Sequence, residues 1–268
     1  MKVDNNINMD DIAKMNNMTL SELRSFLDLV KKGMKPYSKR VLVAEDGINR
    51  YFTVERRGVG KIKTPYGNFW QYNFAVDDQW EKYSVLVKAK IDKRSLNPIF
   101  KNKQNLIVRT DSGCETSQVF NDLTCECEEQ LKLAMKTIAQ EGEGIIVHIP
   151  KQDGRGMGLP FKLATLWLQE NLKVNTVESA LILAPGGTID VRTYSGVICI
   201  LKFFKITPDC QISLATNNPK KAEVFVENGY TVKDYISICI EPNDNTRHHL
   251  RAKQKHLGHL NLMKEDQK

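Results

Sequence analysis

The chain has 268 residues, 41% of them hydrophobic, with 39 basic against 32 acidic side chains. This length suits one large domain, or one domain with a small appendage, and the apolar content suffices for a core. No run of about eighteen apolar residues occurs, which excludes a membrane span, and the polar start MKVDNNINMDDIAKMNN predicts no signal peptide. We therefore expect a cytoplasmic protein with reduced thiols. The net charge of +7 favours an anionic partner, although ordinary surface charge explains it equally well.

Residues 1–56 predict a short helical extension. Thr19-Leu-Ser-Glu22 is typical of a capping box at a helix start, and Gly33 is a plausible end. The apolar residues between them recur at helical spacing: Leu20, Leu23, Leu27 and Val30. The segment ends near Glu55-Arg-Arg-Gly58. A small docking module and a dimerisation arm are both compatible with it.

From Lys61 onwards, β-prone and helical segments alternate. Pro65-Tyr-Gly-Asn68 is a turn between two β-prone runs. Further strands are expected at 83–91, 105–110 and 144–149, and helices around 131–138, at 161–171 and at 195–206. The stretch ISLATNNPKKAEVFVENGY predicts a strand, a turn and a helix, with Asn218 as cap, Pro219 at the first helical position and Gly229 at the end. This alternation indicates a mixed α/β domain over residues 57–268.

Three of the six cysteines lie close together, at Cys114, Cys125 and Cys127. Clustered thiols in a reducing compartment point to metal or chemistry before disulfides. A structural zinc site usually has four protein ligands, whereas a catalytic one has three and leaves a corner for water, whose pKa zinc lowers. A distant histidine as fourth ligand and three unrelated buried thiols are the alternatives. The other cysteines lie in apolar runs and are expected in the core: Cys199, Cys210 and Cys239.

Three polar segments follow the expected strands. KQDGRGMGLP (151–160) has three glycines within five residues, which lets backbone amides approach a ligand, and Arg155 adds a fork for phosphate. It matches neither the Walker nor the Rossmann fingerprint. ATNNPKK (215–221) places two lysines at a helix start, where an anion makes them favourable, and IDVRTY (189–194) offers a charge pair. Taken singly, a flexible turn, a solvated helix start and a surface ion pair are adequate explanations.

Together these motifs resemble GTP cyclohydrolase II, the zinc enzyme that begins riboflavin synthesis. The family pattern runs R-x-H-S-E-C, R-C-D-C-G-x-Q-L, R-Q-E-G-R-G-I-G-L, D-T-V-E-A-N, D-x-R-x-Y, L-T-N-N-P-x-K and K-x-x-x-G-H-L. This chain reads R-T-D-S-G-C, T-C-E-C-E-E-Q-L, K-Q-D-G-R-G-M-G-L, N-T-V-E-S-A, D-V-R-T-Y, A-T-N-N-P-K-K and K-Q-K-H-L-G-H-L. Order and spacing agree from about Lys61 to Leu260. The resemblance implies a mixed-sheet α/β fold, a GTP cyclohydrolase II-like domain that is commonly a homodimer.

The resemblance also implies roles for individual residues. The zinc (Zn²⁺) ligands fall on Cys114, Cys125 and Cys127, and in the family zinc-bound water attacks C8 of guanine, the imidazole ring opens and formate leaves. The arginine nucleophile at the α-phosphate, which releases pyrophosphate, falls on Arg192, and the acid/base aspartate on Asp190. Magnesium (Mg²⁺) would accompany the triphosphate. The nucleotide contacts fall on Arg109, Gln130, Asp153, Gly154, Arg155, Thr176, Thr216 and Lys221.

Departures from the family pattern gather around this site. H-S-E before the first cysteine is Asp111-Ser112-Gly113, and R-C-D-C-G is Thr124-Cys125-Glu126-Cys127-Glu128. The glutamate of Q-E-G-R is Asp153, and residues 184–187 form an insertion ahead of Asp190. The helix after the glycine loop should read K-x-x-A-Y-x-L-Q, but Leu166 stands where the family has its catalytic tyrosine. Leucine cannot donate a hydrogen bond or transfer a proton.

Three functional hypotheses follow. The first is a GTP cyclohydrolase II, either complete or stopping at a partly processed product because the tyrosine is absent. The second is a divergent paralogue that opens another purine, or a pyrimidine such as uracil. The third is a non-catalytic nucleotide-binding protein, which the retained cysteines, Asp190 and Arg192 argue against. Nucleic-acid binding by the basic tail RHHLRAKQKHLGH (247–259) is disfavoured, because the same tail matches the family's last motif.

Overall fold

The computed structural model describes residues 7–77, 82–184, 187, 189–260 and 262–263. The helices are α1 (Met9–Met15), α2 (Leu20–Met34), α3 (Glu115–Gln118), α4 (Cys127–Glu141), α5 (Leu159–Asn171), α6 (Thr176–Leu183), α7 (Ser195–Phe203), α8 (Glu223–Glu227) and α9 (Arg247–Leu257), with 3-10 turns η1 (Asp153–Gly156) and η3 (Pro219–Ala222). The strands are β1 (Tyr37–Glu45), β2 (Ile48–Thr64), β3 (Gly67–Val76), β4 (Tyr83–Lys88), β5 (Lys90–Ile91), β6 (Pro98–Ile99), β7 (Leu106–Ser112), β8 (Gly144–Ile149), β9 (Ile212–Ala215) and β10 (Val232–Ile236).

One eight-stranded sheet organises the chain, in the order β1-β2-β3-β4-β8-β7-β9-β10. The first part is an antiparallel meander, in which β4 also pairs antiparallel with β8. From β8 onwards the strands are parallel: β8 with β7, β7 with β9, and β9 with β10. The mixed α/β fold expected from the sequence is therefore confirmed. The parallel part matters for function, because the carboxyl ends of its strands meet at one edge.

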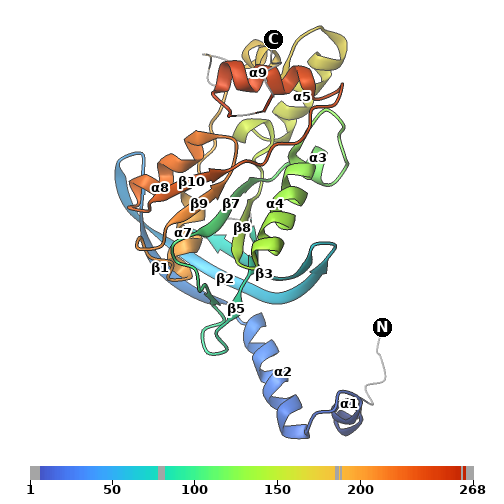
Figure 1. Ribbon diagram of the computed structural model, residues 1–268, viewed down its shortest axis with the longest axis vertical. Helices are drawn as coiled ribbons and strands as arrows, with labels where there is room; N and C mark the ends of the chain where they lie inside the picture. Colours follow the sequence, from blue (N-terminus) through green and yellow to red (C-terminus); the bar gives the residue numbers. More distant parts are fainter. Residues whose placement is uncertain (1–6, 78–81, 185–186, 188, 261, 264–268) are drawn as a thin grey trace.

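Helices cover both faces of the sheet (Figure 1). On one face, Val108 of β7 and Val147 of β8 pack with the buried side chains of α7 and with Phe225 of α8. On the other face, Ile107 and Ile146 pack against Ala134 and Ile138 of α4. Alternate residues of β7 and β8 thus enter different cores, which explains why these strands are apolar throughout.

The N-terminal part is helical only up to residue 34. The capping box at Thr19 and Glu22 is present, and α2 leaves the body with α1 at its far end (Figure 1). The boundary expected after residue 56 falls inside β2, which pairs with β1 on one side and β3 on the other. Residues 37–56 therefore belong to the same sheet as the later strands. Of the helices and strands described in the expected extension, only α1 and α2 lie outside this sheet. A division into two domains stays a prediction.

Several local expectations hold. Thr64 pairs with Gly67 across the predicted turn, and Asn218 caps η3 through Lys220 N, with Pro219 next. Cys199 and Cys210 are buried in the core, whereas Cys239 is only partly buried and corrects that expectation. Pro185 and Gly186 of the insertion lie outside the described residues. Among the helices that the structure describes, none has the length and apolar run that a bilayer crossing needs.

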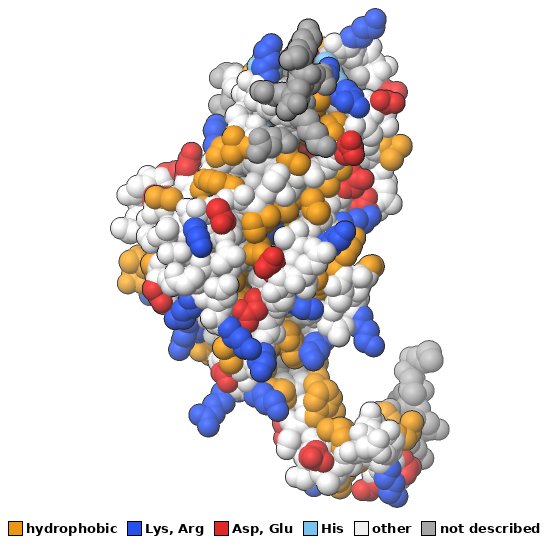
Figure 2. Space-filling model, viewed as in Figure 1, with side chains coloured by type: hydrophobic (Ala, Val, Ile, Leu, Met, Phe, Trp, Pro, Cys, Tyr) orange, Lys and Arg blue, Asp and Glu red, His pale blue; other side chains and the backbone are white. Residues whose placement is uncertain are grey.

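The surface carries its basic residues in more than one place. On the face drawn in Figure 2, lysine and arginine side chains gather at the base of the body, near α2, with acidic side chains among them. Others lie at the opposite end, near the C-terminal helix. The net charge of +7 is thus not concentrated in a single stripe on this face. A role of the positive charge in ligand binding therefore depends on the few lysine and arginine side chains that are buried, rather than on these surface residues.

Candidate active site

The predicted motifs meet at the carboxyl ends of the parallel strands. β7 ends at Ser112 and leads to Cys114, β8 ends at Ile149 and leads to the glycine loop, and β9 ends at Ala215 and leads to Thr216. Because parallel strands end at the same edge, three segments far apart in sequence converge there. One pocket lined by all three occupies this edge.

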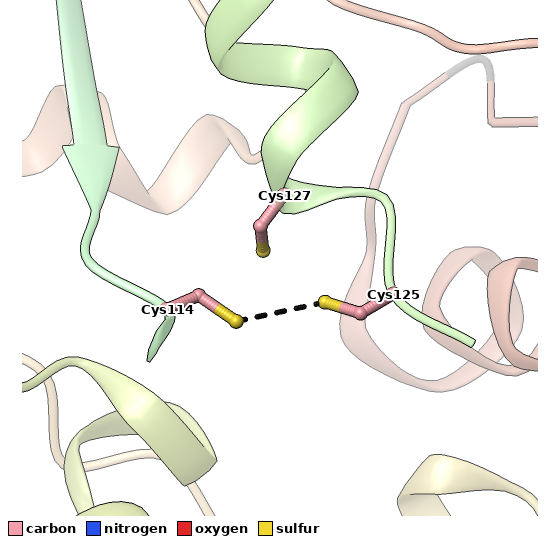
Figure 3. Close-up of side chains that lie close together, drawn as sticks. All are labelled: Cys114, Cys125 and Cys127. Carbon is pink, nitrogen blue, oxygen red and sulfur yellow. Dashed lines mark hydrogen bonds between the residues drawn. The ribbon is translucent and has the colours of Figure 1, made fainter. Parts of the chain in front are cut away.

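The three cysteines of the pocket point toward one another (Figure 3). Cys114 follows β7, Cys125 lies in the next loop and Cys127 is the first residue of α4. Their sulfurs all lie within 4.8 Å of one another, and Sγ of Cys114 and Cys125 are 3.7 Å apart. Zinc–sulfur bonds of about 2.3 Å in a tetrahedron place neighbouring sulfurs about 3.8 Å apart, so the trio fits zinc. Among the residues described, no histidine or carboxylate joins the group as a fourth ligand.

The positive charge beside the cysteines favours the thiolate form. Lys162 Nζ of α5 donates to Cys114 Sγ at 2.7 Å and lies 3.7 Å from Cys125 Sγ. Hydrogen bonds from the Cys125 and Cys127 thiols, together with the Lys162 ammonium, lower the pKa of Cys114 to about 2, although burial opposes the shift. The same sharing of protons raises the pKa of Cys127. These contacts favour the thiolate of Cys114, and binding a metal displaces the protons that the other thiols carry.

The loop 153–158 makes a sharp turn in the same pocket as the cysteines. Gly154 and Arg155 both have left-handed backbone (φ +57° and +59°), and a Cβ at Gly156 would lie 3.1 Å from Arg192 N. Asp153 is buried and accepts a hydrogen bond from Glu115 N at 3.0 Å. Arg155 donates to Thr176 through both the carbonyl and the hydroxyl, at 3.0 and 3.2 Å. The glycines thus permit close backbone packing, while Arg155 is held at the start of α6.

Two buried cations stand at the ends of β7 and β9. Arg109 is 4% exposed and donates to Ala215 O, to Asp111 and to Gln130. Lys221 is 5% exposed and donates to Thr110 O at 2.7 Å and Ser112 Oγ at 3.3 Å. Burial lowers the pKa of Lys221 well below its usual value, and the positive charges of Arg109 and Arg192 lower it further. An anion in the pocket relieves this crowding of positive charge.

Asp190 and Arg192 form a two-pronged ion pair beside the glycine loop. Arg192 Nε donates to Asp190 Oδ1 at 2.8 Å, and its Nη2 donates to Oδ2. Val191 N donates to Arg155 O at 3.0 Å, which joins the two segments. Burial raises the pKa of Asp190, but the hydrogen bonds and charge of Arg192 lower it overall. From sequence, a surface ion pair was an adequate explanation of these two residues. In the structure Arg192 lines the pocket, and its side chain is 12% exposed.

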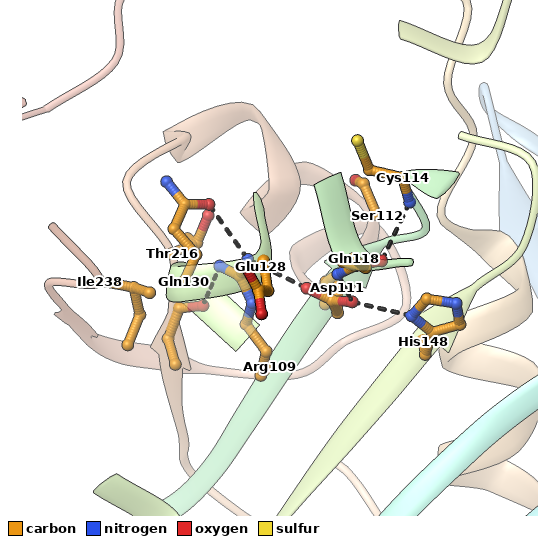
Figure 4. A network of polar contacts seen from close by, with 12 residues as sticks. Arg109, Asp111, Ser112, Cys114, Gln118, Glu128, Gln130, His148, Thr216 and Ile238 are labelled. Carbon is orange, nitrogen blue, oxygen red and sulfur yellow. Dashed lines mark hydrogen bonds and ion pairs between the residues drawn. The ribbon is translucent and has the colours of Figure 1, made fainter. Parts of the chain in front are cut away.

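Asp111, one of the departures before Cys114, is the centre of a polar network (Figure 4). Asp111 is 1% exposed and accepts from Arg109 at 3.2 Å, from Gln118 Nε2 at 3.0 Å and pairs with His148 Nδ1 at 2.9 Å. Gln118 in turn accepts from Cys114 N at 3.0 Å. The carboxylate at position 111 therefore has hydrogen-bond partners on both oxygens, and it links Arg109 to the first cysteine.

The structure gathers the predicted site residues in this single pocket, with one exception. The predicted residues that line it are Cys114, Cys125, Cys127, Arg109, Gln130, Asp153, Gly154, Arg155, Thr176, Arg192, Thr216 and Lys221. Asp190 reaches it only through Arg192. Leu166 also lines the pocket, at the position of the family's tyrosine.

Sequence reasoning missed several further residues of the pocket wall: Lys162, His249, Lys253 and His259. Lys162 is the first residue of the motif K-x-x-A-Y-x-L-Q, and that was the available signal for it. The other three come from α9 and the turn after it, where the basic tail and its G-H-L ending gave the signal. Burial and the nearby Lys253 and Arg192 lower the pKa of His259 to about 4, so it is neutral at pH 7.

Comparisons with known proteins agree with this arrangement. Residues 55–237 match the family model described as GTP cyclohydrolase II. The chain is 34% identical over 199 residues to GTP cyclohydrolase-2 of Buchnera aphidicola, which covers 74% of this chain and 93% of that protein. It is 30% identical over 206 residues to GTP cyclohydrolase-2 of Streptomyces coelicolor (77% and 86%).

Longer relatives and one solved structure complete the comparison. Riboflavin biosynthesis protein RibBA of Phocaeicola vulgatus is 32% identical over 240 residues, which cover 90% of this chain and 55% of that protein. The chain thus spans about half the length of such relatives. A two-domain 3,4-dihydroxy-2-butanone 4-phosphate synthase of A. baumannii, RibBX, overlaps with a TM-score of 0.35 and 14% identity over 85% of this chain and 47% of that one, too little to carry an argument. The match to the family model over most of the chain shows that it belongs to the GTP cyclohydrolase II family.

Proposed function

We propose that this chain is a zinc-dependent hydrolase that opens the imidazole ring of GTP, with release of formate and pyrophosphate. The observation that carries the proposal is that three thiols, whose sulfurs all lie within 4.8 Å of one another, share one pocket with six arginine and lysine side chains. These cations are Arg109, Arg155, Lys162, Arg192, Lys221 and Lys253. The thiols suit a metal that activates water, and the cations suit a triphosphate.

The residues of the chain have distinct parts in this proposal. Cys114, Cys125 and Cys127 would hold the zinc, which would lower the pKa of a water molecule and so provide a nucleophile for C8. Arg109 and Lys221 hold the nucleotide through charge-assisted hydrogen bonds, and magnesium enters with the triphosphate. Asp190 accepts the proton that Arg192 loses as it attacks the α-phosphate and expels pyrophosphate. Water then attacks phosphorus and gives one proton to Arg192 as the P–N bond breaks, and the proton on Asp190 is released to solvent.

Leu166 supports a second candidate function. It lines the pocket where the family tyrosine would donate a hydrogen bond, and Phe161 and Leu257 line the pocket too. A pocket wall with fewer donors suits a different base, so the same metal centre opens another purine or a pyrimidine such as uracil in this second proposal. A non-catalytic nucleotide-binding role is less well supported, because the cysteine trio and the Asp190–Arg192 pair are both kept.

Setting and assembly complete the proposal. Three reduced thiols at a metal site suit a reducing compartment, which supports the cytoplasm. The relatives named riboflavin biosynthesis proteins support a place in that pathway. A homodimer is proposed from the family, and sedimentation of the purified protein tests it. The basic tail forms α9 over the pocket, which supports a small-molecule partner rather than a nucleic acid.

Product analysis tests the activity. Purified protein with zinc and magnesium is given GTP, and formate, pyrophosphate and the ring-opened base are each measured. Equal release of formate and pyrophosphate supports full cyclohydrolase activity, and pyrophosphate without formate limits the chain to partial processing. No turnover of GTP, with opening of another base in a panel of nucleotides and free bases, selects the second candidate.

Cysteine variants test the metal centre in the same assay. Cys125→Ser is expected to lose zinc and all ring opening together, because two thiols rarely hold zinc in a protein site. Cys239→Ser, outside the pocket, is the matched control and keeps both. Ring opening by zinc-free Cys125→Ser protein would refute the metal-dependent proposal.

A further inference from the structure

Helix α9 closes one side of the pocket, although it lies beyond residues 55–237 that match the family. Lys253 and Leu257 of the helix, and His259 after it, line the same pocket as the cysteines. The segment has further attachments to the body. Leu250 and Ala252 are buried, and Leu260 N donates to Asn217 O at 2.8 Å.

One contact connects α9 directly to the cysteine loop. Lys253 Nζ donates to Glu126 Oε1 at 2.6 Å, and the two side chains are 18% and 7% exposed. Glu126 stands between Cys125 and Cys127, and the second oxygen of its carboxylate is buried without a hydrogen-bond partner among the described residues. Lys253 is therefore the one charge that compensates Glu126 in the contacts that the structure describes. Removing Lys253 therefore removes the described contact that ties Glu126, and with it the cysteine loop, to α9.

The loop has few other attachments. Ser117 Oγ donates to Cys125 O at 3.2 Å and accepts from Glu128 N at 2.9 Å, so the backbone is tied to α3 on one side. Glu126 is the residue that attaches the loop to the opposite side, at α9. Loss of this attachment lets Glu126 shift, and both neighbouring cysteines shift with it, because a single residue separates them.

We propose that Lys253 is a positioning residue of the metal centre, which holds the Cys125–Cys127 loop in its metal-binding geometry through Glu126. The C-terminal helix is thereby a structural part of the metal site. This inference rests on the proposed function, since it requires that the cysteine trio binds zinc. Lys253 here acts through the loop and not on the substrate. Partners of this kind typically change metal affinity by about 10–100-fold when they are removed.

Zinc release tests the inference without any activity measurement. Zinc-loaded Lys253→Met protein is mixed with a chromogenic zinc chelator, and the rate and affinity of zinc loss are compared with the original chain. We expect about 10–100-fold weaker zinc binding. Lys255→Met, an exposed position on the same helix, is the matched control and is expected to release zinc at the original rate. Lys253→Arg restores the charge and is expected to recover most of the affinity.

A double variant separates positioning from a simple charge penalty. Glu126→Gln with Lys253→Met removes both charges, so a protein that suffered only from the unpaired carboxylate regains its zinc affinity. The inference predicts that the double variant still binds zinc weakly, since the attachment to α9 is absent. Original affinity in either Lys253→Met or the double variant would overturn the inference while the proposed function stands. Failure of the original chain to bind zinc would overturn both.

Discussion

Gly113→Ala is expected to destabilise the turn that precedes the first metal cysteine. A Cβ at Gly113 would lie 2.5 Å from Ile149 O and 3.1 Å from His148 Nε2. Ile149 O also accepts a hydrogen bond from Gly113 N at 2.7 Å, so the two strand ends cannot separate without losing it. Overpacking of this kind costs about 1–3 kcal/mol, and the reduced entropy of the unfolded chain returns about 0.4–1 kcal/mol. A net loss of about 2 kcal/mol lowers Tm by about 4–8 °C in a chain of this size.

Thermal unfolding followed by circular dichroism measures this loss. Gly60→Ala is the matched control, because Gly60 lies in β2 with nothing within 4 Å of its Cβ position and needs no left-handed backbone. Zinc affinity should fall with Tm in Gly113→Ala only, since the strain falls on the residue next to Cys114. Equal melting of Gly113→Ala and the original chain would show that the steric argument is wrong. The family's glutamate at this position would then be compatible with this backbone.

Two further predictions concern buried charges. Lys221→Met removes a buried cation of the pocket and should raise KM for a nucleoside triphosphate by about 10–100-fold. The factor follows from the loss of a charge-assisted hydrogen bond of about 1.5–3 kcal/mol. Lys220→Met, at the exposed neighbouring position, is the control in the same steady-state assay. For Asp111, burial raises the pKa, but the His148 hydrogen bond and the Arg109 charge lower it overall. A lowered folded pKa adds stability above about pH 4 that is lost as the pH falls further, so Asp111→Asn should flatten that acid loss in urea unfolding between about pH 3 and 6. If Asp111→Asn and the original chain lose stability equally as the pH falls, Asp111 does not cause that loss.

The parallel strands and the cysteine trio were accessible from sequence, whereas the first hairpin was not. β7 and β8 are apolar on both faces, and a helix separates them in the sequence. This pattern leaves few alternatives to two buried parallel strands. In β1 and β2, Val41, Val43, Phe52 and Val54 are buried while their neighbours are partly or fully exposed. This alternation was present in the sequence, but it lies beside an extension outside the family motifs, and charged residues interrupt it. Pairing with β3 decides that these residues complete the sheet, and pairing is a tertiary property.

Contacts across long sequence separations account for the parts of the site that were missed. Glu126 and Lys253 are each ordinary charged residues in sequence, and nothing in their local pattern predicts that they meet. Their pairing depends on where α9 crosses the sheet edge, after β9 and β10 have been placed. The same holds for His259, whose position beside Arg192 follows from the path of the tail. Sequence motifs therefore located the site residues that follow the parallel strands. The positions of the remaining site residues depend on the topology of the fold.

The departures from the family pattern are not equivalent once their contacts are known. Asp111 is paired with Arg109 and His148, Glu126 is paired with Lys253, and at Gly113 any side chain would meet Ile149 O. Each of these substitutions has a structural counterpart that keeps the cysteines in place. Leu166 has no such counterpart, because an aliphatic side chain makes no directional contact in exchange for the hydroxyl. The cysteine trio is thus preserved by compensation, and we propose that a change of substrate or product is concentrated at Leu166. Leu166→Tyr, assayed for formate and for the ring-opened base, is consequently the substitution that separates the two proposed functions.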